Sequence, residues 1–302
     1  MRWLYHALPR ATAERELSGS DDARELRPAS LETEGFVHLS YADRAAESAR
    51  LYVRPDPVVL RVDPRRLPSR LDVASTPRGP MPHLFGPIPR DAIAETLELS
   101  AFETGVPDRV EGTRFGFLAF EGMTLLDLVG VLDPVSRIAG MGFDPTSTCE
   151  VISAGTGTHV WSGLGAALEV TRVRPSLADF DVLVIPGGPG ARTLTRDRTL
   201  LDWLGTFPKN RLAASVCTGS LVWAAEGRLV GKRATTHASA LEALASLGAS
   251  VVRERVVEDE GCLTAAGVTS ALDLGLALVE RFTDADTRAR VAAQMEMPGA
   301  AR

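Results

Sequence analysis

The chain has 302 residues, enough for about two domains, and carries a formal charge of −6 because 39 acidic residues outnumber 33 basic ones. Its hydrophobic content of 45% excludes a disordered chain, and the absence of any stripe of positive charge excludes a nucleic-acid partner bound through a broad basic face. Three cysteines are too few to form a disulfide scaffold over this length, so we expect reduced thiols.

The sequence favours a protein without a membrane partner. No apolar run approaches the ~18 residues that a membrane-spanning helix needs. The first residues, MRWLYHALPRATAERE, reach acidic side chains too early for a secretory signal. We therefore expect a cytoplasmic protein.

Residues 1–104 are predicted to form a small α+β domain of unknown function. An apolar strand over residues 2–8 precedes a polar stretch with helical character, and a helix is expected over residues 41–52. Residues 57–63 alternate apolar and polar side chains like a strand. The proline-rich residues 76–90 are expected to form a loop.

Residues 105–112 lack apolar periodicity and are predicted to be a linker, and residues 113–298 are predicted to form a second domain. In this domain apolar, strand-like runs alternate with helix-like segments, the first of which is expected to be interrupted at Pro134. The strand-like runs lie at residues 114–120, 149–155, 181–188, 212–217 and 262–267. Strands that alternate with helices indicate an α/β layer fold with a mainly parallel sheet.

The sharpest feature is the sequence ASVCTGS, which places Cys217 where a short apolar strand runs straight into a helix. A turn this tight holds one side chain in a strained, exposed position above the carboxyl end of the sheet, as in a nucleophile elbow. Because a helix N-terminus favours negative charge, we expect the pKa of the thiol to be lowered and Cys217 to be reactive. The alternative is a buried structural thiol.

A second glycine-rich sequence, PGGPGAR, follows another apolar strand. Backbone N–H groups there, including that of Gly188, can stabilise developing charge at the same edge of the sheet. The alternative is a turn that needs unusual backbone angles. The sequence matches neither the dinucleotide-binding fingerprint nor the phosphate-binding loop, and no Cys or His residues have zinc-ligand spacing. We therefore expect neither a cofactor nor a metal.

Residues from about 112 to 297 resemble the DJ-1/PfpI (ThiJ/PfpI) superfamily, relatives of the class I glutamine amidotransferases. The matching segments, in the same order as in the superfamily, are FEGMTLLDLVG, VLVIPGGPGAR, ASVCTGS, RATTHASALEAL and LTAAGVTSALDLGLALVE. The resemblance implies a flavodoxin-like sandwich with Cys217 as the nucleophile, a small-molecule substrate and, frequently, a homodimer.

Two residues narrow the resemblance to one branch. The superfamily usually places an acidic residue, often Glu, near the cysteine; here Asp127 stands at that position, and Thr218 follows the cysteine. This combination is similar to the isonitrile hydratase branch. The resemblance implies that Cys217 adds to an isonitrile to give a thioimidate, with Asp127 supplying the acid and Thr218 assisting through hydrogen bonds. The alternative for Asp127 is a purely structural role, because a carboxylate in the first turn of a helix interacts favourably with the helix dipole.

His237 ends a predicted strand in the sequence RATTHA and matches a histidine that lies near the cysteine in many members. It is therefore a candidate for acid–base chemistry or for lining the site. Two other functions stay open. A glyoxalase or deglycase would act on small dicarbonyls with Cys217 and His237, although Glu rather than Asp127 is expected there. A non-catalytic ligand or redox sensor would oxidise Cys217 reversibly.

Residues 1–100 resemble an uncharacterised family, the domain of unknown function 952, through the sequences WLYHAL, EGFVHLS and PMPHLFGPI. The fold of that family has been likened to ADP-ribosyltransferases, in which a histidine on the first strand helps to hold NAD. On that analogy His6, His38 and Ser40 border a pocket and His83 lies beside it. The alternative is that the histidines are hydrogen-bonded core or turn residues.

Overall fold

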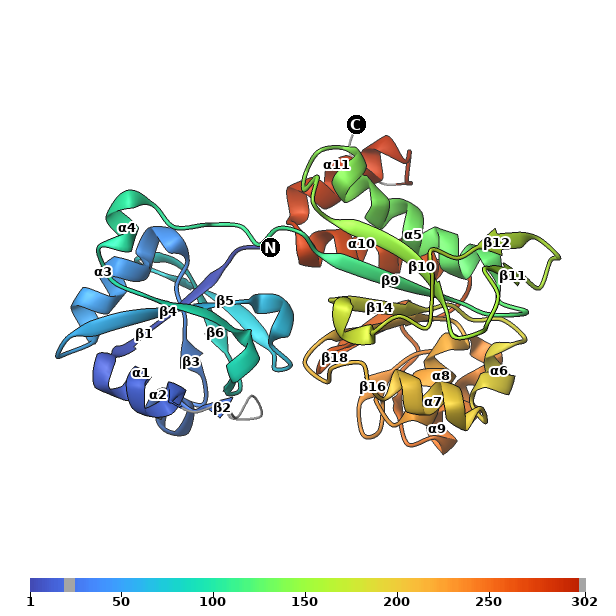
Figure 1. The fold of residues 1–302 in the computed structure, drawn as a ribbon, viewed down its shortest axis with the longest axis horizontal. Helices are drawn as coiled ribbons and strands as arrows, with labels where there is room; N and C mark the ends of the chain where they lie inside the picture. Colours follow the sequence, from blue (N-terminus) through green and yellow to red (C-terminus); the bar gives the residue numbers. More distant parts are fainter. Residues whose placement is uncertain (19–24, 299–302) are drawn as a thin grey trace. The chain divides into compact units, whose positions relative to one another are not determined.

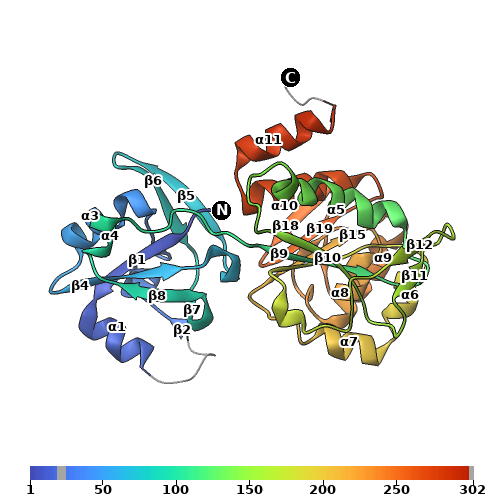
Figure 2. The same ribbon diagram turned by 45° about the horizontal axis from the view of Figure 1, so that its top comes forward.

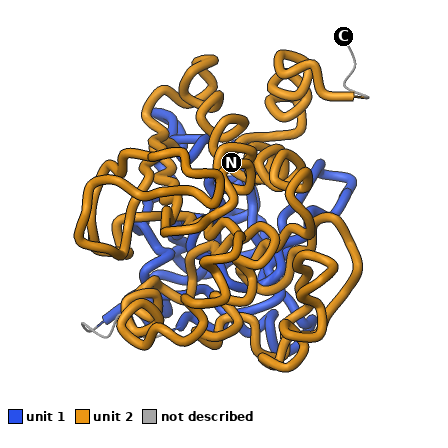
Figure 3. The backbone as a smooth tube through the Cα atoms, turned by 90° about the vertical axis from the view of Figure 1, so that its right-hand side faces the viewer, with its two compact units in different colours: residues 1–110 blue, residues 111–302 orange. Residues whose placement is uncertain are grey.

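The computed structural model of the protein describes residues 1–18 and 25–298. The chain divides into two compact units, the N-terminal unit Met1–Val110 and the C-terminal unit Glu111–Arg302 (Figure 3). No helix within the described residues is both long enough and apolar enough to cross a membrane.

The N-terminal unit is built on a three-stranded antiparallel sheet with the order β1-β4-β8. Its strands are β1 (Leu4–Pro9), β4 (Pro57–Val62) and β8 (Ile93–Leu97). The central strand β4 is covered on both faces, so Val59 and Leu60 are both fully buried. On one face α3 (Ala42–Tyr52) packs against Val59 and Tyr5, and on the other Leu60 joins a larger apolar cluster.

A second antiparallel sheet in this unit has the order β3-β6-β5. Its strands are β3 (Val37–His38), β5 (Leu71–Thr76) and β6 (Gly79–Leu84). The prediction of a loop over residues 76–90 is therefore wrong over β6. The two-residue hairpin turn makes the pair of Thr76 and Gly79 hydrogen-bonded, so Pro80 and Pro82 fall at non-hydrogen-bonded positions opposite β5. Their missing N–H groups cost no bond to that strand.

The residues predicted to be a linker, 105–112, span the division between the units. Val106 packs against the Tyr5 cluster and Trp3 N donates to Asp108 O at 2.9 Å, so the first part of this segment lies on the N-terminal unit. Gly112 belongs to the C-terminal unit, where its N–H donates to Asp144 Oδ2 at 3.0 Å. The remaining elements of this unit are α1 (Arg10–Leu17), α2 (Ala29–Thr33), α4 (Ala101–Thr104) and the paired strands β2 (Glu25–Leu26) and β7 (Ile88–Pro89).

The C-terminal unit contains a seven-stranded sheet with the order β13-β10-β9-β14-β15-β19-β18. Its strands are β9 (Arg114–Ala119), β10 (Thr148–Ser153), β13 (Arg172–Val173), β14 (Val182–Ile185), β15 (Leu212–Val216), β18 (Val256–Asp259) and β19 (Cys262–Ala265). All neighbours are parallel except β18 and β19. The central strands β14 and β15 are buried along their whole length, as expected for a parallel sheet covered on both faces.

Helices cover both faces of this sheet (Figures 1 and 2). One face carries α5 (Leu125–Gly140), α10 (Ser270–Phe282) and α11 (Ala285–Gln294). The other carries α6 (Ala191–Leu194), α7 (Arg198–Leu204), α8 (Gly219–Glu226) and α9 (Leu241–Ser246). Two small sheets complete the unit, β11 (His159–Trp161) with β12 (Ala167–Glu169) and β16 (Arg233–Ala234) with β17 (Ser250–Val251). The predicted α/β sandwich after a small α+β domain is confirmed.

The two long helices α5 and α10 pack side by side on the sheet. The prediction that the first helix is interrupted at Pro134 is wrong, because α5 runs through that residue. Pro134 faces Gly275 of α10, where an added Cβ would lie 2.6 Å from Pro134 Cγ. Only a glycine at this position lets the two helices approach so closely.

Substituting Gly275→Val is expected to destabilise the C-terminal unit by about 1–3 kcal/mol, because the new side chain must push α5 and α10 apart. The midpoint of urea unfolding, followed by tryptophan fluorescence, measures this, since three of the four tryptophans, Trp161, Trp203 and Trp223, lie in the C-terminal unit. Gly140→Ala, at the end of α5 with open space around its Cβ, is the control and should cause no loss. Equal midpoints for the two variants would contradict the packing argument.

Candidate active site

The structure places Cys217 at the junction of a buried strand and a helix, as the sequence predicts. The strand β15 ends at Val216 and α8 begins at Gly219. Cys217 has a φ of +56°, in the left-handed region that a residue other than glycine rarely adopts. Its N–H donates to Ala265 O at 2.9 Å, and its carbonyl accepts from Thr236 Oγ1 at 2.8 Å. These bonds hold the turn in its strained conformation.

Asp127 lies beside the thiol, in the first turn of α5. The side chain is completely buried, and Gly187 N donates to its Oδ2 at 3.0 Å. Its second oxygen, Oδ1, receives no hydrogen bond of ordinary geometry from the described residues, which leaves it available to accept a proton. Cys217 itself is only 6% exposed. The site is therefore a thiol and a carboxylate next to each other in a nearly dry environment.

Burial sets the protonation of this pair. It raises the pKa of Asp127 from 3.8 to about 6, against the opposing effects of the Gly187 N–H, the neighbouring Cys217 thiol and His237. Burial and the negative charge of Asp127 raise the pKa of Cys217 to about 11. The expectation of a lowered thiol pKa is wrong, because these two effects outweigh the stabilising hydrogen bonds from Thr218. At neutral pH the proton resides on sulfur and the carboxylate is mostly ionised.

The turn formed by Gly187 and Gly188 after β14 donates hydrogen bonds to Asp127 and Thr218, the two residues next to the thiol. Gly187 N donates to Asp127, and Gly188 N donates to Thr218 Oγ1 at 2.9 Å. The Thr218 hydroxyl in turn donates to Gly188 O at 3.1 Å. The Gly188 N–H, predicted to face developing charge, is thus occupied by Thr218, whereas the Thr218 N–H bonds to the thiol. The Thr218 side chain bonds to Gly188 and to the thiol, and the Thr218 backbone N–H is a second donor at sulfur.

Gly187 was not singled out from the sequence, yet the neighbouring residues lie so close to it that there is no room for a side chain. An added Cβ there would lie 2.7 Å from Asp127 Oδ2, from Cys217 Cβ and from Thr218 N. Gly187 is the first glycine of PGGPGAR, but the sequence does not reveal that a helix and the turn at Cys217 both approach it closely. Thr236, which bonds to the Cys217 carbonyl, was also missed; it directly precedes His237.

His237 lies close enough for its charge to lower the pKa of Asp127. It does not end a strand, because β16 stops at Ala234, and it begins a short 3-10 turn over Ala238–Ala240 instead. The ring is half-buried, and its Nδ1 accepts from Ser239 N at 3.2 Å. In the neutral ring the proton is therefore on Nε2.

The other two thiols differ from Cys217 in their surroundings. Burial raises the pKa of Cys149 to about 12 and also raises the pKa of Cys262, so both stay protonated at neutral pH. Neither is hydrogen-bonded to a carboxylate of the described residues as Cys217 is to Asp127. Within residues 1–18 and 25–298, no three His, Cys, Asp or Glu side chains are grouped so that they could hold a metal ion.

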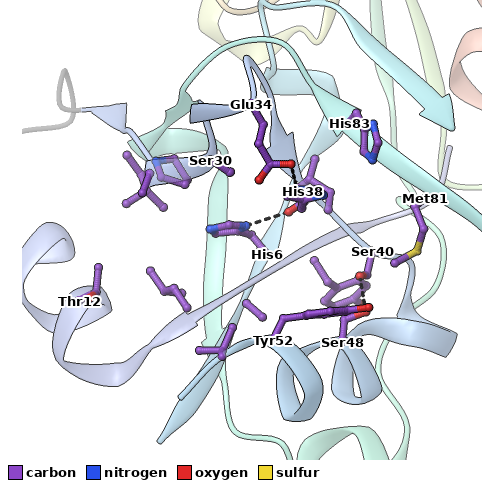
Figure 4. A pocket seen from close by; sticks show the side chains of 18 of the residues that line it. His6, Thr12, Ser30, Glu34, His38, Ser40, Ser48, Tyr52, Met81 and His83 are labelled. Atoms are coloured by element: carbon purple, nitrogen blue, oxygen red, sulfur yellow. Dashed lines mark hydrogen bonds and ion pairs between the residues drawn. The ribbon is translucent and has the colours of Figure 1, made fainter. Parts of the chain in front are cut away.

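The four residues predicted for an N-terminal pocket do line one cavity of that unit: His6, His38, Ser40 and His83 (Figure 4). His6 Nδ1 lies 2.9 Å from His38 O, and His38 Nε2 lies 3.0 Å from Glu34 Oε2. Glu34 was missed, although it stands four residues before His38 in the sequence.

Substituting Asp127→Asn is expected to stabilise the protein at pH 8. The folded-state pKa of about 6 lies above the unfolded value of about 3.9, so the buried carboxylate lowers stability above pH 6 and this penalty disappears below about pH 4. The variant should gain up to about 3 kcal/mol in unfolding free energy at pH 8 and about nothing at pH 4. Urea unfolding at both pH values measures this.

The control is Asp133→Asn, an exposed residue on the same helix, for which we expect a change in unfolding free energy within about 0.5 kcal/mol. A loss of stability at pH 8 for Asp127→Asn would contradict the burial argument.

Comparison with known proteins agrees with the geometry. Residues 114–281 match the model of the DJ-1/PfpI family, and residues 11–96 match that of a protein of unknown function (DUF952). An isonitrile hydratase of Pseudomonas putida is 35% identical over 184 residues, which are 61% of this chain and 78% of that protein. The glutathione-independent glyoxalase DJ-1 of Schizosaccharomyces pombe is 31% identical over 131 residues, 41% of this chain and 68% of that protein.

Solved structures place the C-terminal unit in the same group. A ThiJ/PfpI family protein from Pseudomonas syringae is similar with a TM-score of 0.55 and 31% identity, over 63% of this chain and 76% of that one. The match to the family model covers more than half of the sequence. The chain is therefore a member of the DJ-1/PfpI family.

Proposed function

We propose that the C-terminal unit hydrates isonitriles to N-substituted formamides, with Cys217 as the nucleophile and Asp127 as the carrier of the proton. The observation that supports this most is the pairing of a buried, protonated thiol with a buried carboxylate whose pKa is about 6. An isonitrile needs both a nucleophile and a proton at the same carbon atom. The similarity to an isonitrile hydratase supports the choice of substrate class.

The first step adds the thiol across the terminal carbon of the isonitrile. The Asp127 carboxylate takes the proton from Sγ and passes it to that carbon, which thereby becomes electrophilic. Sulfur then forms the C–S bond, and the product is a neutral thioimidate, R–N=CH–S–Cys217. Asp127 returns to its ionised form. Transfer of the proton from the thiol, with a pKa of about 11, to Asp127, with a pKa of about 6, is uphill, so formation of the C–S bond must drive it.

The second step consumes water. Water adds to the C=N bond, with Asp127 taking a proton from the water oxygen and delivering it to nitrogen. The tetrahedral adduct collapses, the C–S bond breaks, and sulfur recovers the hydroxyl proton. The products are the formamide R–NH–CHO and the free thiol, so no oxidant or reductant is needed. The Thr218 N–H, bonded to sulfur, stabilises the negative charge as the thiolate leaves.

A second candidate is a glyoxalase that acts on small dicarbonyls. Its support is the 31% identity to the glyoxalase DJ-1 of S. pombe and the position of His237 within electrostatic reach of Asp127. A redox sensor has less support. Peroxide reacts with the thiolate, and a thiol pKa of about 11 leaves almost none at neutral pH.

The substrate is tested with cyclohexyl isonitrile and detection of N-cyclohexylformamide by mass spectrometry. The wild-type chain should form the formamide, Cys217→Ala should abolish turnover, and Asp127→Asn should reduce it by ~10²–10⁴-fold because the proton carrier is lost. Cys149→Ala is the matched control and should keep the wild-type rate. Unchanged formamide production by Cys217→Ala or Asp127→Asn would refute the mechanism. Turnover of methylglyoxal without any formamide from the isonitrile would favour the glyoxalase.

The pH dependence of kcat/KM follows from the same pair. Below pH 6 Asp127 becomes protonated and cannot take the thiol proton, so the rate should fall about tenfold for each further pH unit and reach a plateau above pH 6. Since the two groups interact, the midpoint belongs to the pair. A profile of initial rates measures it, and Asp127→Asn should lose the acidic limb. A wild-type rate that falls as pH rises from 6 to 8 would contradict this assignment.

A further inference from the structure

A cavity of about 1330 Å³ lies within the N-terminal unit, and all of its lining residues belong to that unit (Figure 4). Its wall comes from β1, α1, α2, α3 and the β5–β6 hairpin, and joins apolar side chains such as Leu39 and Met81 to several polar ones. Pockets of this mixed character are typical of small-molecule sites. The polar groups of the wall indicate which hydrogen-bond donors, acceptors and charges a ligand should carry.

His6 presents an unused hydrogen-bond acceptor to this cavity. The side chain, on β1, is only 7% exposed. Its Nδ1 lies 2.9 Å from His38 O, and a carbonyl can only accept, so Nδ1 carries the proton. Burial lowers the pKa of His6, which keeps the ring neutral and leaves a lone pair on Nε2. Within the described chain Nε2 has no hydrogen-bond partner.

Ser40 and Ser48 present an unused donor. Their Oγ atoms are 3.1 Å apart, and Arg78 Nη2 donates to Ser48 Oγ at 3.3 Å. The two serines carry two hydroxyl hydrogens, and the bond between them uses one. The other finds no acceptor among the described residues. Both serines line the cavity and are nearly buried, so a ligand there can accept this hydrogen.

The charged residues of the wall do not favour an anion. Each of its three arginines is already paired with a carboxylate: Arg15 with Glu16 at 3.0 Å, Arg27 with Glu25 at 3.0 Å and Arg78 with Glu47 at 3.2 Å. Glu32 and Glu34 add further negative charge to the lining. A ligand with a diphosphate would face this wall without an uncommitted arginine among those lining it.

We propose that this cavity is a second ligand site, which binds an uncharged small molecule that carries an N–H or O–H donor and a carbonyl acceptor on an apolar body. The donor bonds to His6 Nε2, the acceptor takes the free hydroxyl hydrogen of the Ser40–Ser48 pair, and the apolar part packs on Leu39 and Met81. A secondary amide has this combination. The inference is independent of the reaction proposed at Cys217.

Three matched probes test the site on the full-length chain: N-cyclohexylacetamide, N-cyclohexyl-N-methylacetamide, which lacks the N–H, and the anion cyclohexylacetate. Saturation-transfer NMR titrations measure their dissociation constants. We expect the secondary amide to bind about threefold to tenfold more tightly than the tertiary amide, the gain typical of one hydrogen bond, and more tightly than the anion.

His6→Asn separates binding from folding, because the asparagine amide can still donate to His38 O but offers nothing at the position of Nε2. This variant should lose the preference for the secondary amide and keep the wild-type circular dichroism spectrum. His6→Gln, which places an amide group near that position, should retain part of the preference, and Cys217→Ala should bind the probes like the wild type. Four outcomes would overturn the proposal: equal binding of the two amides by the wild type, an undiminished preference in His6→Asn, tighter binding of cyclohexylacetate than of the secondary amide, or no saturable binding of any probe.

Discussion

The left-handed backbone of Cys217 is the constraint on which the candidate active site depends. A residue other than glycine adopts this conformation at a cost of about 1–3 kcal/mol, so the surrounding structure must hold it. The bonds from Ala265 and Thr236 do so, from a neighbouring strand and a loop. The turn ends β15 abruptly and starts α8 within two residues, which brings the thiol to the first turn of α5 and to Asp127.

The same burial that makes the site unfavourable for charge also makes it suitable for proton transfer. A carboxylate with a pKa of about 6 next to a thiol with a pKa of about 11 keeps one proton between two groups at neutral pH. The cysteine is thus not a preformed thiolate. It becomes nucleophilic only when Asp127 takes its proton, which suits a substrate that needs that proton at its own reacting carbon.

Each unit has a polar atom at its site that no described residue bonds in ordinary geometry. At Cys217, Gly187 and Gly188 donate to Asp127 and Thr218, but Asp127 Oδ1 accepts no such bond and is free to take a proton. In the N-terminal cavity the hydrogen bond of His6 Nδ1 to His38 O fixes the ring and leaves its other nitrogen free to bond a ligand.

The fold class and the position of Cys217 at a strand-to-helix junction could be predicted from the sequence, because apolar periodicity and short motifs are local. Family resemblance added the pairing with Asp127 and the histidines of the N-terminal cavity. The rise in the pKa of the thiol and the bond already made by the Gly188 N–H could not be predicted, because they depend on burial and on pairing between distant residues, such as Asp127 and Gly187, which are 60 positions apart. The strand that holds Pro80 and Pro82 pairs locally with β5 and also with the distant β3. Burial and the placement of each hydrogen-bond partner exist only once the layers are assembled.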